Sequence, residues 1–259
     1  MGVTNFTMLL TILVITLLLT ITVSYGVSVK LGHVPLAFPY ISETGNTQPE
    51  SCIFSFGMNI ASFLYAVAVY LRYRELVHFR AMSPESRISV PWNRFGLWLG
   101  SLSALGLCVV ANFQVGKVPV PHYLGAMCCF VGGSAYFALQ TWFSKRMCPQ
   151  VSTKQMVVLR TALTVMSAVA LVVCVASALV AIPQFDGNMH WTDQVDWRPE
   201  HKGYALHCVS TAAEWLVALL FVGSIVTYIP EMRAVSLSPP TFRILLLESV
   251  TTTKVAEKY

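Results

Sequence analysis

Residues Met8–Val29, MLLTILVITLLLTITVSYGVSV, contain no charged side chain and are long enough to cross a lipid bilayer. The hydrocarbon core is about 30 Å thick and needs about 20 helical residues. Five further apolar stretches follow at Cys52–Leu71, Phe95–Phe113, His122–Phe143, Val157–Ile182 and Ala205–Ile229. Backbone groups must be paired inside lipid, so each stretch is expected to be a helix. The sequence therefore predicts an all-α membrane protein with six transmembrane helices over residues 1–237 and a short tail over residues 238–259.

The composition agrees with this class. Hydrophobic residues make up 55% of the chain and charged residues only 11%, whereas soluble domains carry about 25% charged residues. The sequence has no Walker loop, GxSxG elbow, HExxH or CxxC motif and no dinucleotide fingerprint. We therefore expect no cofactor and no metal site, and any function must lie in the bundle, its connections or the tail.

Basic residues are distributed unevenly between the connections. Of the 17 Lys and Arg residues, 13 lie on the side that carries the segment Arg72–Arg94, the segment after the fourth stretch and the tail. The positive-inside rule places that side, with both termini, in the cytosol. The same cluster is expected to contact anionic lipid headgroups rather than nucleic acid. Cys52 and Cys208 fall on the opposite side, where they could form a disulfide in an oxidising compartment.

Five polar residues are expected in the half of the bilayer away from the basic side. They are Asn59, Asn112, His122, His207 and Glu214. His207 and Glu214 are seven residues apart and so share a helix face. Polar groups at this depth are costly and often functional, so we take the five as a candidate luminal polar pocket. The alternative is that they form hydrogen bonds between helices without any further role.

A tyrosine-based motif, Tyr73-Arg74-Glu75-Leu76, follows the second stretch and fits a YxxΦ sorting signal. Tyr73 and Leu76 would be its two recognition residues. The alternative is an aromatic residue at the membrane interface.

Several strings, in order and spacing, resemble the DRAM family, the damage-regulated autophagy modulators. The strings, which fall between Ser24 and Leu237, include Phe38–Gly45, Pro49–Ser51, Arg72-Tyr73, Val110–Gln114, Trp197–Glu200, Lys202–Tyr204, Thr211–Trp215 and Thr227–Ile229. Glu43 stands where the family typically has Asp, which preserves the charge. The resemblance implies a six-span protein of lysosomal and endosomal membranes that promotes autophagy and influences cell death.

Three functions remain open at this point. The first is a non-enzymatic regulator that acts through lipids or through protein partners, which the sequence does not identify. The second is a lipid-modifying enzyme that uses Glu214 and His207 as acid and base, although no nucleophile or metal set accompanies them in the sequence. The third is a carrier for a small solute. We expect the first and no enzymatic activity.

Overall fold

Six long helices build the molecule, a computed structural model in which residues 6–37, 39–187 and 197–232 are described. They are α1 (Phe6–Lys30), α2 (Glu50–Met82), α3 (Val90–Asn112), α4 (Pro119–Arg146), α5 (Lys154–Ala181) and α6 (Tyr204–Met232). Three short 3-10 helices lie in connections, η1 (Ile41–Gly45), η2 (Pro84–Ser86) and η3 (Ile182–Gln184). All six helices are long and apolar enough to cross a membrane. The prediction of an all-helical, six-span protein is confirmed.

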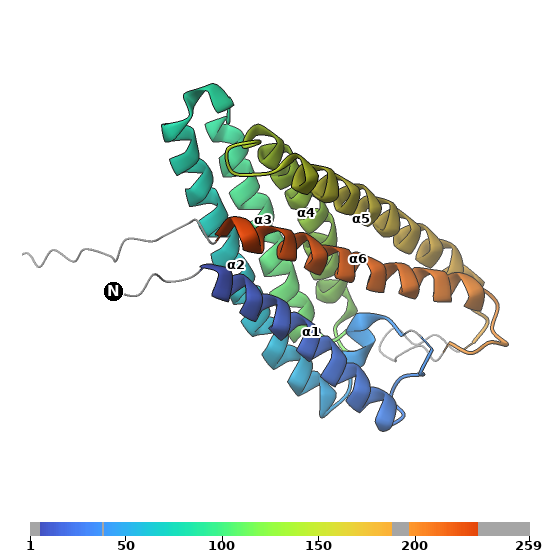
Figure 1. Cartoon of the computed structure of the whole chain (residues 1–259). Helices are drawn as coiled ribbons and strands as arrows, with labels where there is room; N and C mark the ends of the chain where they lie inside the picture. Colours follow the sequence, from blue (N-terminus) through green and yellow to red (C-terminus); the bar gives the residue numbers. More distant parts are fainter. Residues whose placement is uncertain (1–5, 38, 188–196, 233–259) are drawn as a thin grey trace, which may run out of the picture.

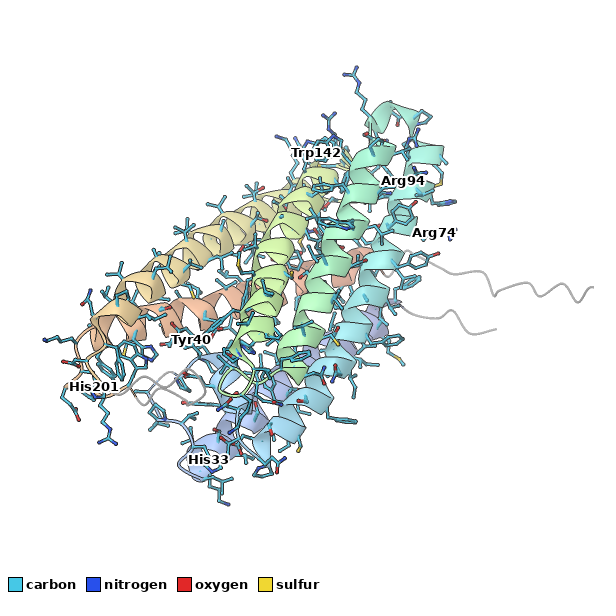
Figure 2. All side chains as sticks on the ribbon, turned by 180° about the vertical axis from the view of Figure 1, so that it is seen from behind. His33, Tyr40, Arg74, Arg94, Trp142 and His201 are labelled. Atoms are coloured by element: carbon cyan, nitrogen blue, oxygen red, sulfur yellow. The ribbon has the colours of Figure 1, made fainter. Side chains whose placement is uncertain are left out.

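The helices pack in chain order as a ring. Each contacts the next along the chain, and α6 closes the ring against α1 (Figure 1). The connections α2–α3 and α4–α5 and the outer ends of α1 and α6 lie at one end of the ring, which we call the basic end. The other three connections lie at the opposite end. Figure 2 shows Arg74, Arg94 and Trp142 at the basic end and His33, Tyr40 and His201 at the other.

Local sequence explains where several helices begin and end. The Thr153 hydroxyl accepts a hydrogen bond from the Met156 N–H and so caps α5. Gly32 follows α1 with a φ of 75°, a left-handed conformation that favours glycine. Pro91 lies in the first turn of α3, where its missing N–H costs nothing.

The helix α2 extends beyond its predicted span, which corrects the expectation of a loop over Arg72–Arg94. It continues as a helix to Met82, and only residues 83–89 connect it to α3. The reason is an amphipathic face that the hydropathy pattern did not reveal. Leu76 and Phe79 are buried against Phe143 and Met147 of the α4 end. Burial of this face stabilises helix outside the hydrocarbon core.

Close backbone contact joins α3 to α4. A Cβ atom on Gly106 would lie 2.6 Å from the Gly125 carbonyl oxygen and 2.5 Å from the Cys129 amide nitrogen. Small residues permit this approach, which is the usual way that helices gain packing energy in lipid. Inside the ring, a cavity of about 40 Å³ lies between α1, α2, α4 and α6. Its lining is mostly apolar, and its volume is too small for a large solute.

Candidate functional site

The connection between α1 and α2 turns back into the end of the ring opposite the basic end. We call its segment Pro39–Gly45 the plug. It packs against α1, α2 and α6. Three successive residues of the plug are held by α6. The Trp215 indole donates to the Pro39 carbonyl at 2.8 Å, the Tyr40 hydroxyl donates to Ser210 Oγ at 2.7 Å, and the Ile41 N–H donates to Glu214 Oε2 at 2.8 Å.

A second carboxylate, that of Glu43, lies within the plug itself and binds its backbone. Glu43 Oε2 accepts a hydrogen bond from the Tyr40 N–H at 2.9 Å. Burial raises the pKa of Glu43 to about 8, the backbone hydrogen bond from Tyr40 opposes that shift, and the nearby Glu214 adds to it. Burial likewise raises the pKa of Tyr40 above its ordinary value. Two adjacent backbone N–H groups, of Tyr40 and Ile41, are thus bound by two different carboxylates.

His207 joins the plug through its ring. The ring stacks on Trp197 with centroids 4.5 Å apart, and it meets Tyr40 edge to face at 5.3 Å. His207 and Glu214, predicted to share a face of the sixth span, therefore both contact the plug. His207 contacts Tyr40 and Glu214 binds Ile41, so these two neighbouring plug residues link them. No sequence pattern predicted that link.

The other three predicted pocket residues lie in two further groups. Asn59 and Asn112 exchange amide hydrogen bonds of 3.0 and 2.8 Å between α2 and α3. The His122 Nδ1 lies 2.6 Å from the Phe113 carbonyl, where it closes the end of α3. Among the described residues, the five predicted pocket residues therefore lie in three separate groups. Cys52 and Cys208 are both free thiols.

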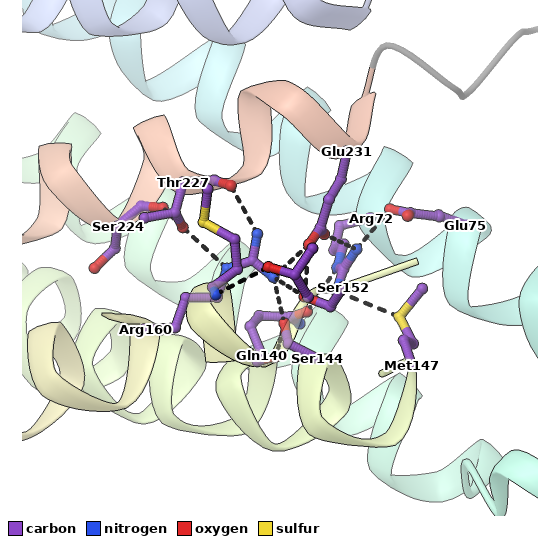
Figure 3. A network of polar contacts seen from close by, with 12 residues as sticks. Arg72, Glu75, Gln140, Ser144, Met147, Ser152, Arg160, Ser224, Thr227 and Glu231 are labelled. Atoms are coloured by element: carbon purple, nitrogen blue, oxygen red, sulfur yellow. Dashed lines mark hydrogen bonds and ion pairs between the residues drawn. The ribbon is translucent and has the colours of Figure 1, made fainter. Parts of the chain in front are cut away.

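Figure 3 shows a different polar cluster, at the basic end, which we call the arginine cluster. Arg160 of α5 is buried, with 1% of its surface exposed. Its guanidinium donates to Ser144 Oγ at 2.7 Å and Ser152 Oγ at 3.0 Å, and it forms an ion pair with Glu231 Oε1 at 2.8 Å. It also donates to the Thr227 hydroxyl and carbonyl, at 3.0 and 2.7 Å.

Arg72 of α2 is the second buried guanidinium of the cluster. It donates to Glu75 Oε2 at 2.8 Å and to Gln140 Oε1 at 3.1 Å, and lies 3.6 Å from Glu231 Oε2. The Tyr228 ring lies against both guanidinium groups, with centroid distances of 3.8 Å to Arg160 and 5.0 Å to Arg72. Two positive and two negative side chains balance here, which lowers the cost of burying them.

The arginine cluster is the part of the site that sequence reasoning missed. Arg160 and Gln140 stand out as polar residues inside apolar stretches, but Arg72 and Glu75 were assigned to a loop. The available signal was the i, i+3 spacing of Arg72 and Glu75, which is that of a helical ion pair. Together these contacts join α2, α4, α5 and α6 at one end of the ring.

The predicted sorting residues are part of α2. Tyr73 is half-buried and Leu76 has no exposed surface. For Tyr73 and Leu76 to meet an adaptor protein, this end of α2 would have to unwind. The sorting signal stays a prediction. Among the described residues, no group of three His, Cys, Asp or Glu side chains could hold a metal ion.

Comparison with known proteins places this fold. The family model described as the Frag1/DRAM/Sfk1/Cwh43P N-terminal domain matches residues 5–235. The chain belongs to the Frag1/DRAM family. This membership confirms the resemblance drawn from the sequence strings, and the match covers the whole helix ring with its plug and its arginine cluster.

Three relatives of the chain are named as modulators of autophagy or macroautophagy. DNA damage-regulated autophagy modulator protein 2 of Rattus norvegicus is 39% identical over 228 residues, 87% of this chain and 83% of the relative. DNA damage-regulated autophagy modulator protein 1 of Mus musculus is 37% identical over 217 residues, 83% of this chain and 86% of the relative. The modulator of macroautophagy TMEM150B of Bos taurus is 39% identical over 110 residues, 42% of this chain and 44% of the relative. No solved structure matches the chain.

Proposed function

We propose that the chain is a modulator of autophagy that acts from lysosomal and endosomal membranes, with an influence on apoptosis, as a non-enzymatic regulator. The observation that carries the proposal is similarity over more than four fifths of the chain to relatives named autophagy modulators. The proposed location in a membrane is supported by the six helices, which are all long and apolar enough to cross a bilayer.

The site geometry supports regulation more than catalysis. Glu214 binds a backbone N–H and His207 is held between two aromatic rings, so both are used to seat the plug. A general acid–base pair needs its groups turned towards a substrate. The arginine cluster is likewise directed inwards, at the helices it joins. Regulation would then act through exposed surfaces, on anionic headgroups at the basic end and on protein partners.

The test uses cells that lack their own copy of the gene. Wild-type chain is reintroduced, and both autophagic flux and the fraction of the protein in lysosomes are measured. We expect flux to be restored together with lysosomal delivery. Unchanged flux with normal delivery would show that the shared sequence does not carry the shared function. Lipidomics and solute uptake in proteoliposomes of the purified chain test the enzyme and carrier alternatives directly.

Orientation is part of the proposal, with the basic end in the cytosol. Charge asymmetry supports it, since exposed arginines gather at that end. Epitope tags in the α2–α3 connection and after Gly187 test it. The first should be reached by antibody after selective permeabilisation of the plasma membrane, and the second only after the internal membranes are opened. The reverse pattern would invert every assignment of sides.

A further inference from the structure

A small hollow lies outside the ring at the basic end, where the end of α2 meets the start of α3. It is lined by Tyr73, Val77 and Arg80 of α2 and by Ser89, Val90 and Asn93 at the start of α3. Its volume is about 20 Å³. One water-sized polar group fits into such a space.

The first turn of α3, whose residues Ser89 and Val90 line this hollow, has uncapped backbone donors. Ser89 is the N-cap residue, yet its side chain makes no capping hydrogen bond. The N–H groups of Val90 and Trp92 belong to the first turn, where a helix offers no internal acceptor. Pro91 between them has no N–H. Such a helix N-terminus favours an anion, and phosphate is the usual one.

Asn93 supplies a second and independent indication of a ligand. The residue is 4% exposed, and its Oδ1 has no hydrogen-bond partner within the described part of the chain. Its Nδ2 donates to the Tyr73 carbonyl at 3.1 Å. A carbonyl accepts only, so this bond fixes which end of the amide is the oxygen. Asn93, which lines the hollow, therefore carries an unsatisfied acceptor close to the start of α3, and a buried polar atom without a partner is costly.

The surroundings indicate where such a ligand comes from. Arg80 is exposed and lines the hollow, and Arg74, Arg87 and Arg94 are exposed nearby, against one exposed acid, Glu85. Figure 2 shows Arg74 and Arg94 on this same part of the basic end. An anion is attracted here by net positive charge.

An aromatic column leads from the hollow towards the bilayer core. Trp92 meets Phe95 edge to face, and Phe95 stacks on Trp98 with centroids 6.0 Å apart. All three side chains are exposed on the surface of α3. Aromatic belts mark headgroup depth, so an apolar chain attached to the anion could lie along this column.

We propose that the hollow binds the headgroup of an anionic phospholipid. The phosphate lies on the N-terminus of α3 beside Arg80, and a hydroxyl or ammonium of the headgroup donates to Asn93 Oδ1. This proposal rests on the contact with anionic headgroups proposed above. It adds the residues that make the contact and the headgroup chemistry that they prefer. A free phosphate ester would share the phosphate chemistry, but not the aromatic column.

The experiment measures lipid retention by native mass spectrometry of the full purified chain in detergent micelles. The micelles contain phosphatidylglycerol, phosphatidylmethanol or phosphatidylcholine. The first two are anionic, but only phosphatidylglycerol has headgroup hydroxyls. We expect retention to rank glycerol above methanol above choline. Equal retention of all three by the wild-type chain would overturn the proposal.

Two pairs of variants separate the site from general charge. Arg80→Gln should lower phosphatidylglycerol retention about tenfold, equivalent to about 1.4 kcal/mol, whereas Arg94→Gln removes the same charge outside the hollow and should change it little. Ser89→Glu places a carboxylate on the helix N-terminus and should block binding, whereas Ser89→Gln should not. A Glu at this position does not weaken the helix, so melting temperatures should stay close to wild type. Equal losses in Arg80→Gln and Arg94→Gln would overturn the site.

Asn93→Leu tests the hydroxyl preference by itself. It should remove the difference between phosphatidylglycerol and phosphatidylmethanol while anionic lipid is still retained over phosphatidylcholine. A persisting difference would overturn the role of Oδ1. Inorganic phosphate added in excess should not displace the lipid, and full displacement would assign the hollow to a soluble phosphate instead. Lipid retention and autophagic flux are separate measurements. Lost retention with normal flux in Arg80→Gln would support the lipid site and show that autophagy does not need it.

Discussion

The two ends of the helix ring are closed by different means. At one end a loop is inserted, and the Ile41 N–H and the Tyr40 hydroxyl of the plug donate to Glu214 and Ser210 of α6. At the basic end, side chains of three helices form ion pairs through Arg72, Arg160, Glu75 and Glu231. The guanidinium groups stay charged at any physiological pH, whereas the plug contains Glu43, whose pKa burial raises to about 8. The first closure should therefore respond to the pH at its own end of the ring, and the second should determine how much of the protein folds.

The largest effect is expected at the arginine cluster. Arg160→Leu leaves Glu231 and the Thr227 carbonyl without their main partner and should lower the free energy of unfolding by about 3–5 kcal/mol. Thermal melting in detergent and the yield of mature protein measure this. The double variant Arg160→Leu with Glu231→Leu removes both charges and should recover much of the loss. If the double variant is as unstable as the single one, the ion pair is not what stabilises this end.

Substitution of Glu214 should cost less stability than substitution of Arg160. It should also lower autophagic activity more than it lowers the amount of protein. Glu214→Ala removes the acceptor of the Ile41 N–H, at a cost of about 1–3 kcal/mol. We expect it to reduce autophagic flux more than the amount of lysosomal protein, while Glu214→Gln keeps an acceptor oxygen and the fold. Normal flux and delivery for the Ala variant would reduce Glu214 to a tolerated structural residue.

Glu43 should make stability depend on pH. Its pKa is raised from the ordinary 4.5 to about 8 in the folded chain, so the folded state binds the extra proton between these values. Its contribution is therefore greatest below about pH 4.5 and is lost as the pH rises towards 8. Melting temperature should fall over this window, and Glu43→Gln should flatten that fall. An unchanged slope in Glu43→Gln would assign the pH dependence to other groups.

The smallest effect belongs to the amide pair between α2 and α3. Asn59→Leu removes two hydrogen bonds to Asn112, but polar pairs inside bundles average only about 0.6 kcal/mol. Asn112 is exposed and keeps its bond to the Cys108 carbonyl. A shift in melting temperature of a few degrees at most is expected. A collapse of expression would mean that this pair matters more than either closure.

The sequence predicted all six helices, because length and hydropathy alone indicate a span, but only four of the twelve predicted ends lie within one residue of the observed ones. It also placed His207 and Glu214 on one face of the sixth span. What it could not supply was the loop partner, since Tyr40 and Ile41 are about 170 residues away and no periodicity links them. It misplaced Arg72 and Glu75 for a related reason. Charged residues lower the mean hydropathy, so a helix that continues past the lipid with a buried charged face appears as a loop.

The helix α6 binds the plug at one end and the arginine cluster at the other. Glu214 seats the plug and Glu231 meets both arginines, and at 1.5 Å per residue they lie about 26 Å apart on one rod. One helix therefore supplies a carboxylate to each closure. Any change in the length of α6 between Glu214 and Glu231 would therefore change the spacing of the two closures.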